Sequence, residues 1–259
     1  MEDVSLTVRT VFGEDAGQLC EIYAYYVRST AATFENEPPD AAEFSERIRR
    51  ATEKYPYLVI EDEDGVLGFA FAHAFRERPA YDYAAETTIY LRPDVRRRGL
   101  GRAIYSALES ELKRMGVRNL YACVALPNGE DEFLTMDSPD FHEALGFRRC
   151  GTFYNCGCKF GHWYSMIWME KIIGDFPEAP APLIPYPEAL HGAEKPVSRL
   201  SDCDGRRVRL VTVDGEVFIG EASQFPAEYG LHVFGRDEEG LEVGCISVFA
   251  SDIESVDLV

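Results

Sequence analysis

The spacing of apolar residues changes between two periods along the first two thirds of the chain. Apolar positions recur every three to four residues in four segments, which predicts helices at residues 15–28, 39–54, 99–115 and 140–145. Short apolar or alternating runs between them predict strands at residues 6–11, 57–61, 66–75, 87–91, 120–125, 152–158 and 166–171. This order of elements predicts a mixed α/β domain with a sheet at its centre.

The last third of the chain has a different pattern. Six prolines occur between residues 174 and 196, and proline at this density blocks both helices and central strands. We therefore expect a first domain at residues 1–173, a proline-rich linker at 174–196 and a second domain at 197–259. Short strands are predicted in the second domain at residues 207–213, 216–221, 230–234, 242–249 and 253–258. They favour a small all-β barrel or sandwich.

The composition narrows the classes of function. The 259 residues include 45 Asp and Glu against 26 Lys and Arg, a net charge of -19, with 46% hydrophobic residues. This apolar content excludes wholesale disorder, and the acidity argues against nucleic acid as a partner. No apolar run approaches the length of a membrane span, and the N-terminus lacks the features of a secretory signal. The seven cysteines do not make a disulfide framework, which favours a reducing cytoplasm. Together with the absence of a long apolar run, this leads us to expect a cytoplasmic protein without a membrane partner.

One turn concentrates positive charge in this acidic chain. It reads Arg96-Arg-Arg-Gly-Leu-Gly-Arg102 and lies between a predicted strand and a predicted helix. Its glycines allow close approach of the backbone, and the helix start offers unpaired N–H groups and the positive end of a dipole. The pattern predicts a site for an anion the size of pyrophosphate, the alternative being a tight turn with a solvated basic rim. Ile104 excludes the dinucleotide motif G-x-G-x-x-G, and no Gly-Lys-Ser/Thr follows as in a P-loop.

This turn resembles the acetyl-CoA loop of the GNAT N-acetyltransferase superfamily, which reads Arg/Gln-x-x-Gly-x-Gly/Ala. Further stretches narrow the resemblance to the phosphinothricin and methionine sulfoximine acetyltransferases. These stretches are Ser29-Thr-Ala-Ala-Thr-Phe-Glu35, Tyr55-Pro-Tyr-Leu-Val59, Ala80-Tyr-Asp-Tyr83, Glu86-Thr-Thr-Ile-Tyr90, Leu126-Pro-Asn128, Phe141-His-Glu-Ala-Leu-Gly-Phe147 and Lys159-x-Gly-x-Trp163. The resemblance covers residues 4–172 and implies an α/β (α+β) GNAT fold with a mixed central sheet.

The resemblance also implies a binding site for the co-substrate acetyl-CoA. Backbone groups of Ile89, Tyr90 and Leu91 would hold the pantetheine arm and polarise the thioester carbonyl. Asn128 would contact the cofactor. The residues expected at the pyrophosphate are Arg96, Arg97, Arg98, Gly99, Leu100, Gly101 and Arg102.

Family members transfer the acetyl group directly to a neutral amine, so a base must remove a proton near neutral pH. The resemblance assigns this role to Glu86, acting through water, whereas a strand-end glutamate taken alone is more often part of an ion pair. Since an ordinary glutamate titrates near about 4.3, the role requires partial burial or a water relay. His142 could relay a proton or shape the site near the cofactor sulfur, with a packing role as the alternative.

The acceptor side of the site follows from the same resemblance. Phe34 and Glu35 would line the amine pocket, while Arg76 and Arg78 would clamp an acidic group of the substrate or remain solvated charges. The hypothesis is an N-acetyltransferase for a small amino-acid-like amine of the phosphinothricin or methionine sulfoximine type. The alternatives are another acceptor, such as a polyamine or a protein N-terminus, and a non-catalytic acyl-CoA-binding sensor.

Three regions depart from the family pattern. Residues 129–137 are an insertion beside the expected cofactor sulfur. Cys150, Cys156, Cys158 and His162 lack the spacing of a zinc site, so we expect no metal and cysteines packed in the core or a groove. The tail resembles a Sm-like small β-barrel whose acidity disfavours RNA. We expect it to act as an interaction or dimerisation module of a homodimer, or else as a stabilising lid.

Overall fold

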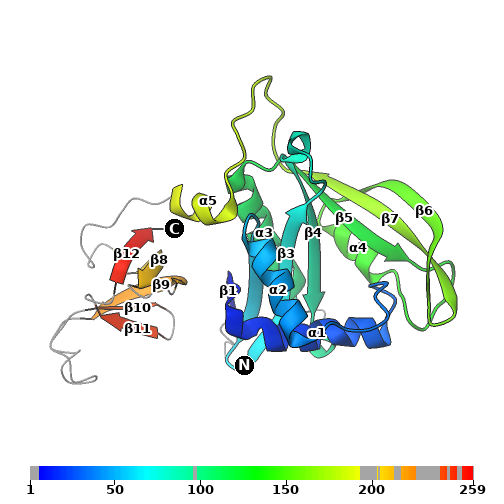
Figure 1. Cartoon of the computed structure of the whole chain (residues 1–259), viewed down its shortest axis with the longest axis horizontal. Helices are drawn as coiled ribbons and strands as arrows, with labels where there is room; N and C mark the ends of the chain where they lie inside the picture. The colour runs from blue at the N-terminus through cyan, green and yellow to red at the C-terminus, as the bar shows by residue number, and fades with distance from the viewer. Residues whose placement is uncertain are drawn as a thin grey trace. The chain divides into compact units, whose positions relative to one another are not determined.

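The computed structural model describes residues 6–95, 98–192, 203, 205–212, 217–225, 240–243, 246–249 and 253–258. The chain divides into two compact units, Met1–Tyr186 and Pro187–Val259. Each unit contains a sheet of its own (Figure 1).

The first unit is built on a seven-stranded sheet with the order β1-β2-β3-β4-β5-β7-β6. Its strands are β1 Thr7–Thr10, β2 Tyr57–Asp62, β3 Gly65–Ala74, β4 Ala84–Leu91, β5 Asn119–Leu126, β6 Arg148–Lys159 and β7 His162–Ile172. Neighbouring strands are antiparallel except β4 and β5, which run parallel. This mixed sheet confirms the predicted α/β architecture.

Helices cover both faces of this sheet (Figure 1). The longer ones are α1 Ala16–Ser29, α2 Ala41–Thr52, α3 Leu100–Met115 and α4 Asp137–Ala144, and single 3-10 turns occupy Gly13–Asp15, Pro79–Tyr81 and Pro93–Val95. The ring of Tyr23 in α1 lies 5.1 Å from that of Tyr90 in β4, while the hydroxyl of Tyr105 in α3 bonds to Thr87 of the same strand. Odd and even residues of a strand face opposite sides, so α1 and α3 lie on opposite faces. In the part of the chain that is described, no helix is long and apolar enough to cross a membrane.

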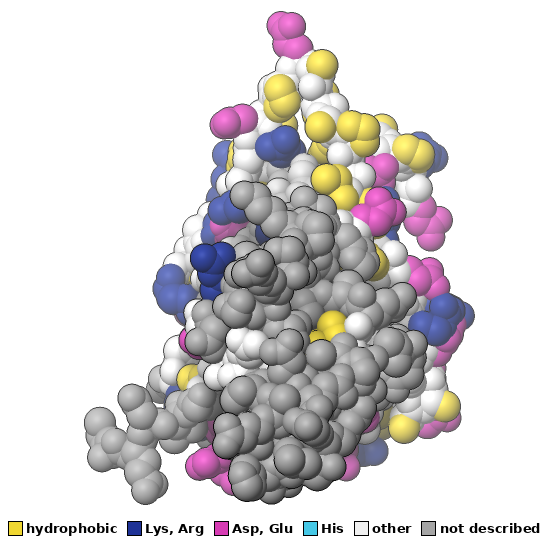
Figure 2. All heavy atoms as spheres, turned by 90° about the vertical axis from the view of Figure 1, so that its left-hand side faces the viewer, with side chains coloured by type: hydrophobic (Ala, Val, Ile, Leu, Met, Phe, Trp, Pro, Cys, Tyr) yellow, Lys and Arg dark blue, Asp and Glu magenta, His cyan; other side chains and the backbone are white. Residues whose placement is uncertain are grey.

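The proline-rich segment differs from the predicted extended linker. Residues Tyr186–Gly192 form the helix α5, because Pro187 falls in the first turn, where a helix does not use its N–H. The N–H of Tyr186 donates to the carbonyl of Lys54 at 2.9 Å, which holds this end of the segment on the first unit. Figure 2 shows apolar side chains exposed at the top of the view, where residues 174–185 lie.

The second unit contains a five-stranded antiparallel sheet with the order β11-β10-β9-β8-β12. Its strands are β8 Arg206–Thr212, β9 Val217–Phe225, β10 Gly240–Val243, β11 Ile246–Phe249 and β12 Ile253–Leu258. The prediction of one strand at 242–249 was wrong, because β10 and β11 pair with each other and Val243 lies opposite Ile246. The strand predicted at 230–234 lies outside the described residues. A closed barrel is not shown and stays a prediction.

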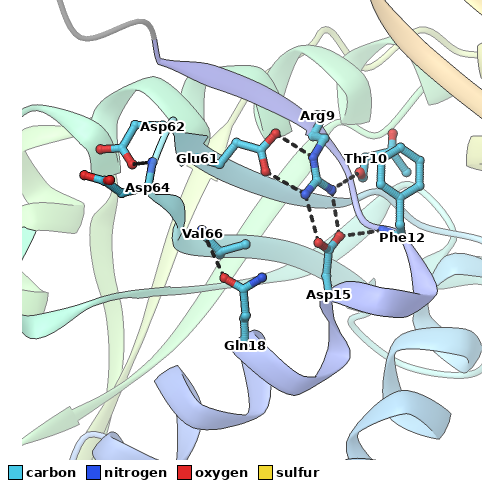
Figure 3. A network of polar contacts seen from close by, with 9 residues as sticks. All are labelled: Arg9, Thr10, Phe12, Asp15, Gln18, Glu61, Asp62, Asp64 and Val66. Carbon is cyan, nitrogen blue, oxygen red and sulfur yellow. Dashed lines mark hydrogen bonds and ion pairs between the residues drawn. The ribbon is translucent and has the colours of Figure 1, made fainter. Parts of the chain in front are cut away.

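A buried ion-pair network connects β1, β2 and the turn before α1 (Figure 3). Arg9 donates to Asp15 from Nη1 at 2.6 Å and Nη2 at 2.8 Å, and to Glu61 from Nε at 2.8 Å and Nη2 at 2.7 Å. Asp15 also accepts the N–H of Phe12 at 2.7 Å. Burial alone would lower the pKa of Arg9, but these carboxylates outweigh it and raise the pKa. The Asp15 side chain is 5% exposed, so its charge depends on Arg9 for compensation.

Replacing Arg9 with methionine is expected to lower the free energy of unfolding by about 3 kcal/mol, because it leaves the Asp15 carboxylate buried and unpaired. Chemical denaturation of the full chain measures this change. The double variant Arg9→Met/Asp15→Asn is expected to recover part of the loss, since it also removes the uncompensated charge. A single variant as stable as the wild type would contradict the assigned role of Arg9.

Candidate active site

The sheet of the first unit opens between its two parallel strands. Pairing between β4 and β5 is confined to Ala84 with Asn119, Ala85 with Leu120, and Glu86 with Tyr121, although each strand has eight residues. Beyond Glu86 the two strands diverge (Figure 1). Their separation leaves a gap in the sheet, lined on one side by the C-terminal half of β4.

Backbone groups of β4 face this gap. The N–H of Arg92 donates to the carbonyl of Leu67 in β3 at 2.8 Å. Since the direction of N–H and C=O groups alternates along a strand, those of Ile89 and Leu91 point the other way, toward the gap. The Leu91 carbonyl accepts from the hydroxyl of Tyr26 at 2.6 Å. The peptide groups of Ile89 are therefore the part of β4 best placed to bind an extended ligand arm.

The start of α3 follows the end of β4 and has the features expected of an anion site. Gly99 has φ +81°, a conformation that favours glycine, and it caps the helix. A Cβ at Gly101 would lie 3.0 Å from the ring of Phe141, so this position requires glycine for close packing. Arg98 and Arg102 are exposed beside the unpaired N–H groups of the first helical turn. Arg96 and Arg97 lie outside the described residues.

Glu86 lies at the narrow end of the gap, where β4 and β5 still pair. Its side chain is 18% exposed, and its Oε1 lies 3.9 Å from Nε2 of His73 in β3. Burial raises the pKa of Glu86, and the charges of Arg76 and of His73 in its protonated form reduce that increase without cancelling it. A carboxylate with a raised pKa is a better proton acceptor near neutral pH than an ordinary glutamate.

Arg76 lies just after β3, over an aromatic surface formed by Phe75, Tyr121 of β5 and Trp168 of β7. Phe75 stacks on Tyr121 with centroids 4.1 Å apart and meets Trp168 edge to face at 5.5 Å. The guanidinium of Arg76 lies 4.4 Å from the centroid of Phe75. Arg78 is exposed immediately before the 3-10 turn Pro79–Tyr81. Arg76 is close enough to Glu86 for its charge to lower the pKa of that carboxyl, and Arg78 lies two residues further along the chain.

The loop between α1 and α2 carries the two residues predicted to line the amine pocket. Phe34 lies 6.2 Å from the ring of Tyr164 in β7. The Glu35 carboxylate forms an ion pair with Arg47 of α2 at 2.8 Å. Lys159 at the end of β6 donates to the carbonyl of Thr33 at 2.8 Å. These contacts fix the loop against both α2 and the β6–β7 hairpin.

His142 is 4% exposed within α4, and its Nδ1 donates to the carbonyl of Ser138 at 2.8 Å. It packs against the rings of Tyr105, Phe141 and Phe147. Burial lowers its pKa, which favours the neutral ring. These contacts support packing, and a proton relay through His142 stays a prediction.

Asn128 holds the end of β5 against the β6–β7 hairpin. Its Nδ2 donates to Asn155 Oδ1 at 2.8 Å and to the carbonyl of Trp163 at 2.7 Å. Its Oδ1 accepts from the hydroxyl of Ser165 at 2.6 Å. Because both amide hydrogens are engaged within the protein, contact between Asn128 and a cofactor stays a prediction.

The inserted residues 129–137 are anchored by Asp131. Its carboxylate accepts from Nδ1 of His162 at 2.8 Å and from the hydroxyl of Tyr164 at 3.1 Å. Burial alone would raise the pKa of Asp131, but these bonds and that from the N–H of Phe133 lower it. The insertion therefore packs on β7. Sequence spacing did not reveal this contact, since Asp131 and His162 are brought together by the hairpin.

Cys150, Cys156 and Cys158 are exposed on β6. A core position for Cys156 and Cys158 is therefore wrong, and their packing in a groove stays a prediction. Both odd and even residues of β6 are mostly exposed, so neither face of this strand is covered over most of its length by the described residues. Within the described residues, no group of three or more His, Cys, Asp or Glu side chains could hold a metal ion.

Comparison with known proteins shows which family the first unit resembles. The GNAT acetyltransferase domain family matches residues 8–168. The phosphinothricin N-acetyltransferase of Streptomyces viridochromogenes is 32% identical over 175 residues, 68% of this chain and 90% of the relative. The L-methionine sulfoximine/L-methionine sulfone acetyltransferase of Salmonella typhimurium is 28% identical over 169 residues, 64% of this chain and 93% of the relative. A phosphinothricin acetyltransferase from Sinorhizobium meliloti, solved in complex with AcCoA, aligns with a TM-score of 0.62 and 34% identity, over 70% of this chain and 98% of its own.

The fold is that of an N-acetyltransferase. The chain belongs to the GNAT acetyltransferase family. The resemblance found in the sequence is thereby confirmed for the first unit. The Sm-like interpretation of the tail is not supported, since the family match ends at residue 168.

Proposed function

We propose that this chain transfers the acetyl group of acetyl-CoA directly to the amine of a small amino-acid-like molecule of the phosphinothricin or methionine sulfoximine type. The observation that carries the proposal is Glu86, a half-buried carboxylate with a raised pKa at the narrow end of the β4–β5 gap. The names of the relatives and the presence of AcCoA in the solved relative support the choice of substrates.

The residues along the gap fit acetyl-CoA. Ile89, Tyr90 and Leu91 would hold the pantetheine arm, with the peptide groups of Ile89 facing the gap. The pyrophosphate would bind at the start of α3, where the helix dipole and the exposed Arg98 and Arg102 favour an anion. Arg96 and Arg97 are proposed to add to this charge.

Glu86 would remove the proton that keeps the acceptor amine from reacting. An ammonium group has no lone pair, so its proton moves to the Glu86 carboxylate, directly or through water. The freed amine then attacks the thioester carbonyl, the new C–N bond forms and the C–S bond breaks. The leaving CoA thiolate takes up the second proton of the attacking amine, which gives the N-acetyl product and CoA–SH. The peptide groups of Ile89 would polarise that carbonyl.

Arg76 would bind an acidic group of the acceptor. A guanidinium pairs with carboxylate or phosphinate oxygens through two parallel hydrogen bonds, and Arg76 is close enough to Glu86 to influence its pKa. Phe34 and Glu35 would line the far wall of the pocket, although Glu35 is engaged by Arg47. Arg78 is proposed as a second cation at the rim.

An amine panel tests this function. The full chain is incubated with acetyl-CoA and phosphinothricin, methionine sulfoximine, spermidine or a peptide with a free N-terminus, and the acetylated amine is measured. We expect kcat/KM for one of the two amino acids to exceed that for spermidine and the peptide by at least about tenfold. Acetyl-CoA binding without turnover of any amine would contradict the proposal and favour a sensor.

We further propose that the protein is a cytoplasmic homodimer in which residues 197–259 form a small β-barrel. The support for the dimer is β6, whose outer edge is unpaired in the described sheet, and the exposure of Phe153 and Tyr154 along it. Analytical sedimentation of the full chain tests the dimer.

A further inference from the structure

A histidine that the sequence did not single out lies directly opposite the candidate base. In the antiparallel pair of β3 and β4, His73 is the cross-strand partner of Glu86. Directly opposite residues project their side chains to the same face, so imidazole and carboxylate meet on the acceptor side of the sheet. Their separation of 3.9 Å is about 1 Å longer than a hydrogen bond, a difference that a small side-chain rotation removes.

A second contact decides which nitrogen of His73 can accept a proton. Nδ1 lies 3.2 Å from the backbone carbonyl of Ala74. A carbonyl accepts hydrogen bonds and cannot donate them, so Nδ1 carries the hydrogen of the neutral ring. The lone pair is then on Nε2, the nitrogen that faces Glu86. The ring is thus oriented to receive a proton from the carboxyl group.

Two other ionisable groups, Arg76 and Cys123, interact electrostatically with Glu86 and are unsuited to this transfer. Arg76 stays protonated and has no lone pair to offer. Cys123 of β5 is close enough for Glu86 to influence it, and burial together with Glu86 raises the pKa of this thiol to about 11, so it remains neutral. His73 has a side chain that is 44% exposed, which gives the ring access to water. Among the three groups, His73 alone combines proton acceptance with contact to solvent.

We propose that His73 is a positioning residue that orients Glu86 and carries the proton away from it. This inference rests on the proposed function. Acetylation of an ammonium group releases one net proton: R–NH₃⁺ and acetyl-CoA give R–NH–acetyl, CoA–SH and H⁺. Glu86 takes a proton from the ammonium group, and the Glu86 carboxyl then donates it to Nε2 of His73. The imidazolium releases it to water, and Glu86 is again a carboxylate for the next acceptor.

Chemical rescue tests the relay. The variants His73→Ala and His73→Phe are compared with the wild type in the full chain, and the acetylated amine is measured so that acetylation of imidazole itself is not counted. We expect kcat/KM at pH 7 to fall about tenfold in both variants, with acetyl-CoA binding unchanged. Added imidazole is expected to restore His73→Ala at least threefold, and more strongly as the pH rises and neutral imidazole accumulates. His73→Phe is not expected to respond, because its ring fills the site.

Two controls separate the relay from a structural role. His162→Ala removes a similarly exposed histidine that is paired with Asp131, and imidazole is expected to leave its rate unchanged. His73→Gln keeps a polar side chain without a relay, so it is expected to be as slow as His73→Ala. Wild-type rates within twofold in all His73 variants, or a loss that imidazole does not restore, would overturn the inference. Absence of turnover in the wild type would instead refute the proposed function.

Discussion

Replacing Glu86 with glutamine is expected to lower kcat/KM at pH 7 by about 100- to 1,000-fold. Glutamine keeps the shape and hydrogen-bonding capacity of the side chain but cannot take a proton from the acceptor ammonium. Acetyl-CoA binding is expected to be unchanged, because the gap along β4 and the start of α3 are not altered. Steady-state kinetics at several pH values, with calorimetric titration of acetyl-CoA, measure both quantities.

The raised pKa of Glu86 gives this prediction a pH signature. In the wild type, kcat/KM is expected to rise with pH, and the midpoint of this ascending limb is expected to lie above the usual pKa of glutamate. Glu86→Gln is expected to lose this pH dependence. A carboxyl whose pKa is raised on folding adds stability at low pH and loses it as the pH rises through the folded-state pKa. The variant is therefore expected to be at least as stable as the wild type at pH 7.

A matched control is available on β7. Glu170 is equally exposed at 18% and pairs with Arg148, so Glu170→Gln removes a similar charge away from the proposed proton path. Its kcat/KM is expected to stay within about threefold of the wild type. A Glu86→Gln variant with wild-type activity would refute the role of Glu86 as the base, and it would leave the family assignment intact.

Replacing Arg76 with methionine is expected to raise KM for acceptors that carry an acidic group by about 10- to 100-fold. Methionine covers the rings of Phe75 and Trp168 but cannot pair with a carboxylate or phosphinate. A matched amine without the acidic group is expected to show no such change, and it serves as the substrate control. Initial rates over a range of acceptor concentrations separate KM from kcat.

The charge of Arg76 also affects the pKa of Glu86, independently of any contact with the acceptor. Its positive field lowers the pKa of Glu86, so Arg76→Met is expected to move the ascending pH limb to higher pH. Arg76→Lys keeps the charge and loses the bidentate geometry, so it should retain the limb and still raise KM. If Arg76→Met changes neither KM nor the limb, Arg76 does not contact the acceptor.

The elements of the first unit were predictable because their signals are local. The 3.6-residue period marks α1, α2 and α3, and two short continuous apolar runs mark the strands β2 and β3. Predictions failed where partners outside the segment decide the outcome. Residues 242–249 read as one strand because the apolar pattern does not mark where β10 ends and β11 begins. The helix at Tyr186–Gly192 was missed because the prolines before it outweighed the one proline that a first turn tolerates.

The residues of the candidate site also fall into two groups, those that local sequence motifs predict and those that only the fold brings together. Short contiguous motifs in the sequence were enough to select the turn at residues 96–102, Glu86 and Arg76. His73 and Asp131 could not be selected in this way. The contact of His73 with Glu86 depends on the register of two strands, and that of Asp131 with His162 depends on the path of a hairpin.

The sequence by itself determined the family, the order of strands and helices, and the position of the arginine and glycine turn, since each is written in contiguous residues. The tertiary structure decided how those pieces meet. It separated β4 from β5 beyond Glu86, buried that carboxylate enough to raise its pKa, set His73 opposite it, and brought the charge of Arg76 close enough to influence it. Proton affinity depends on solvent exclusion and on charges from other strands, and both exist only once the sheet has formed.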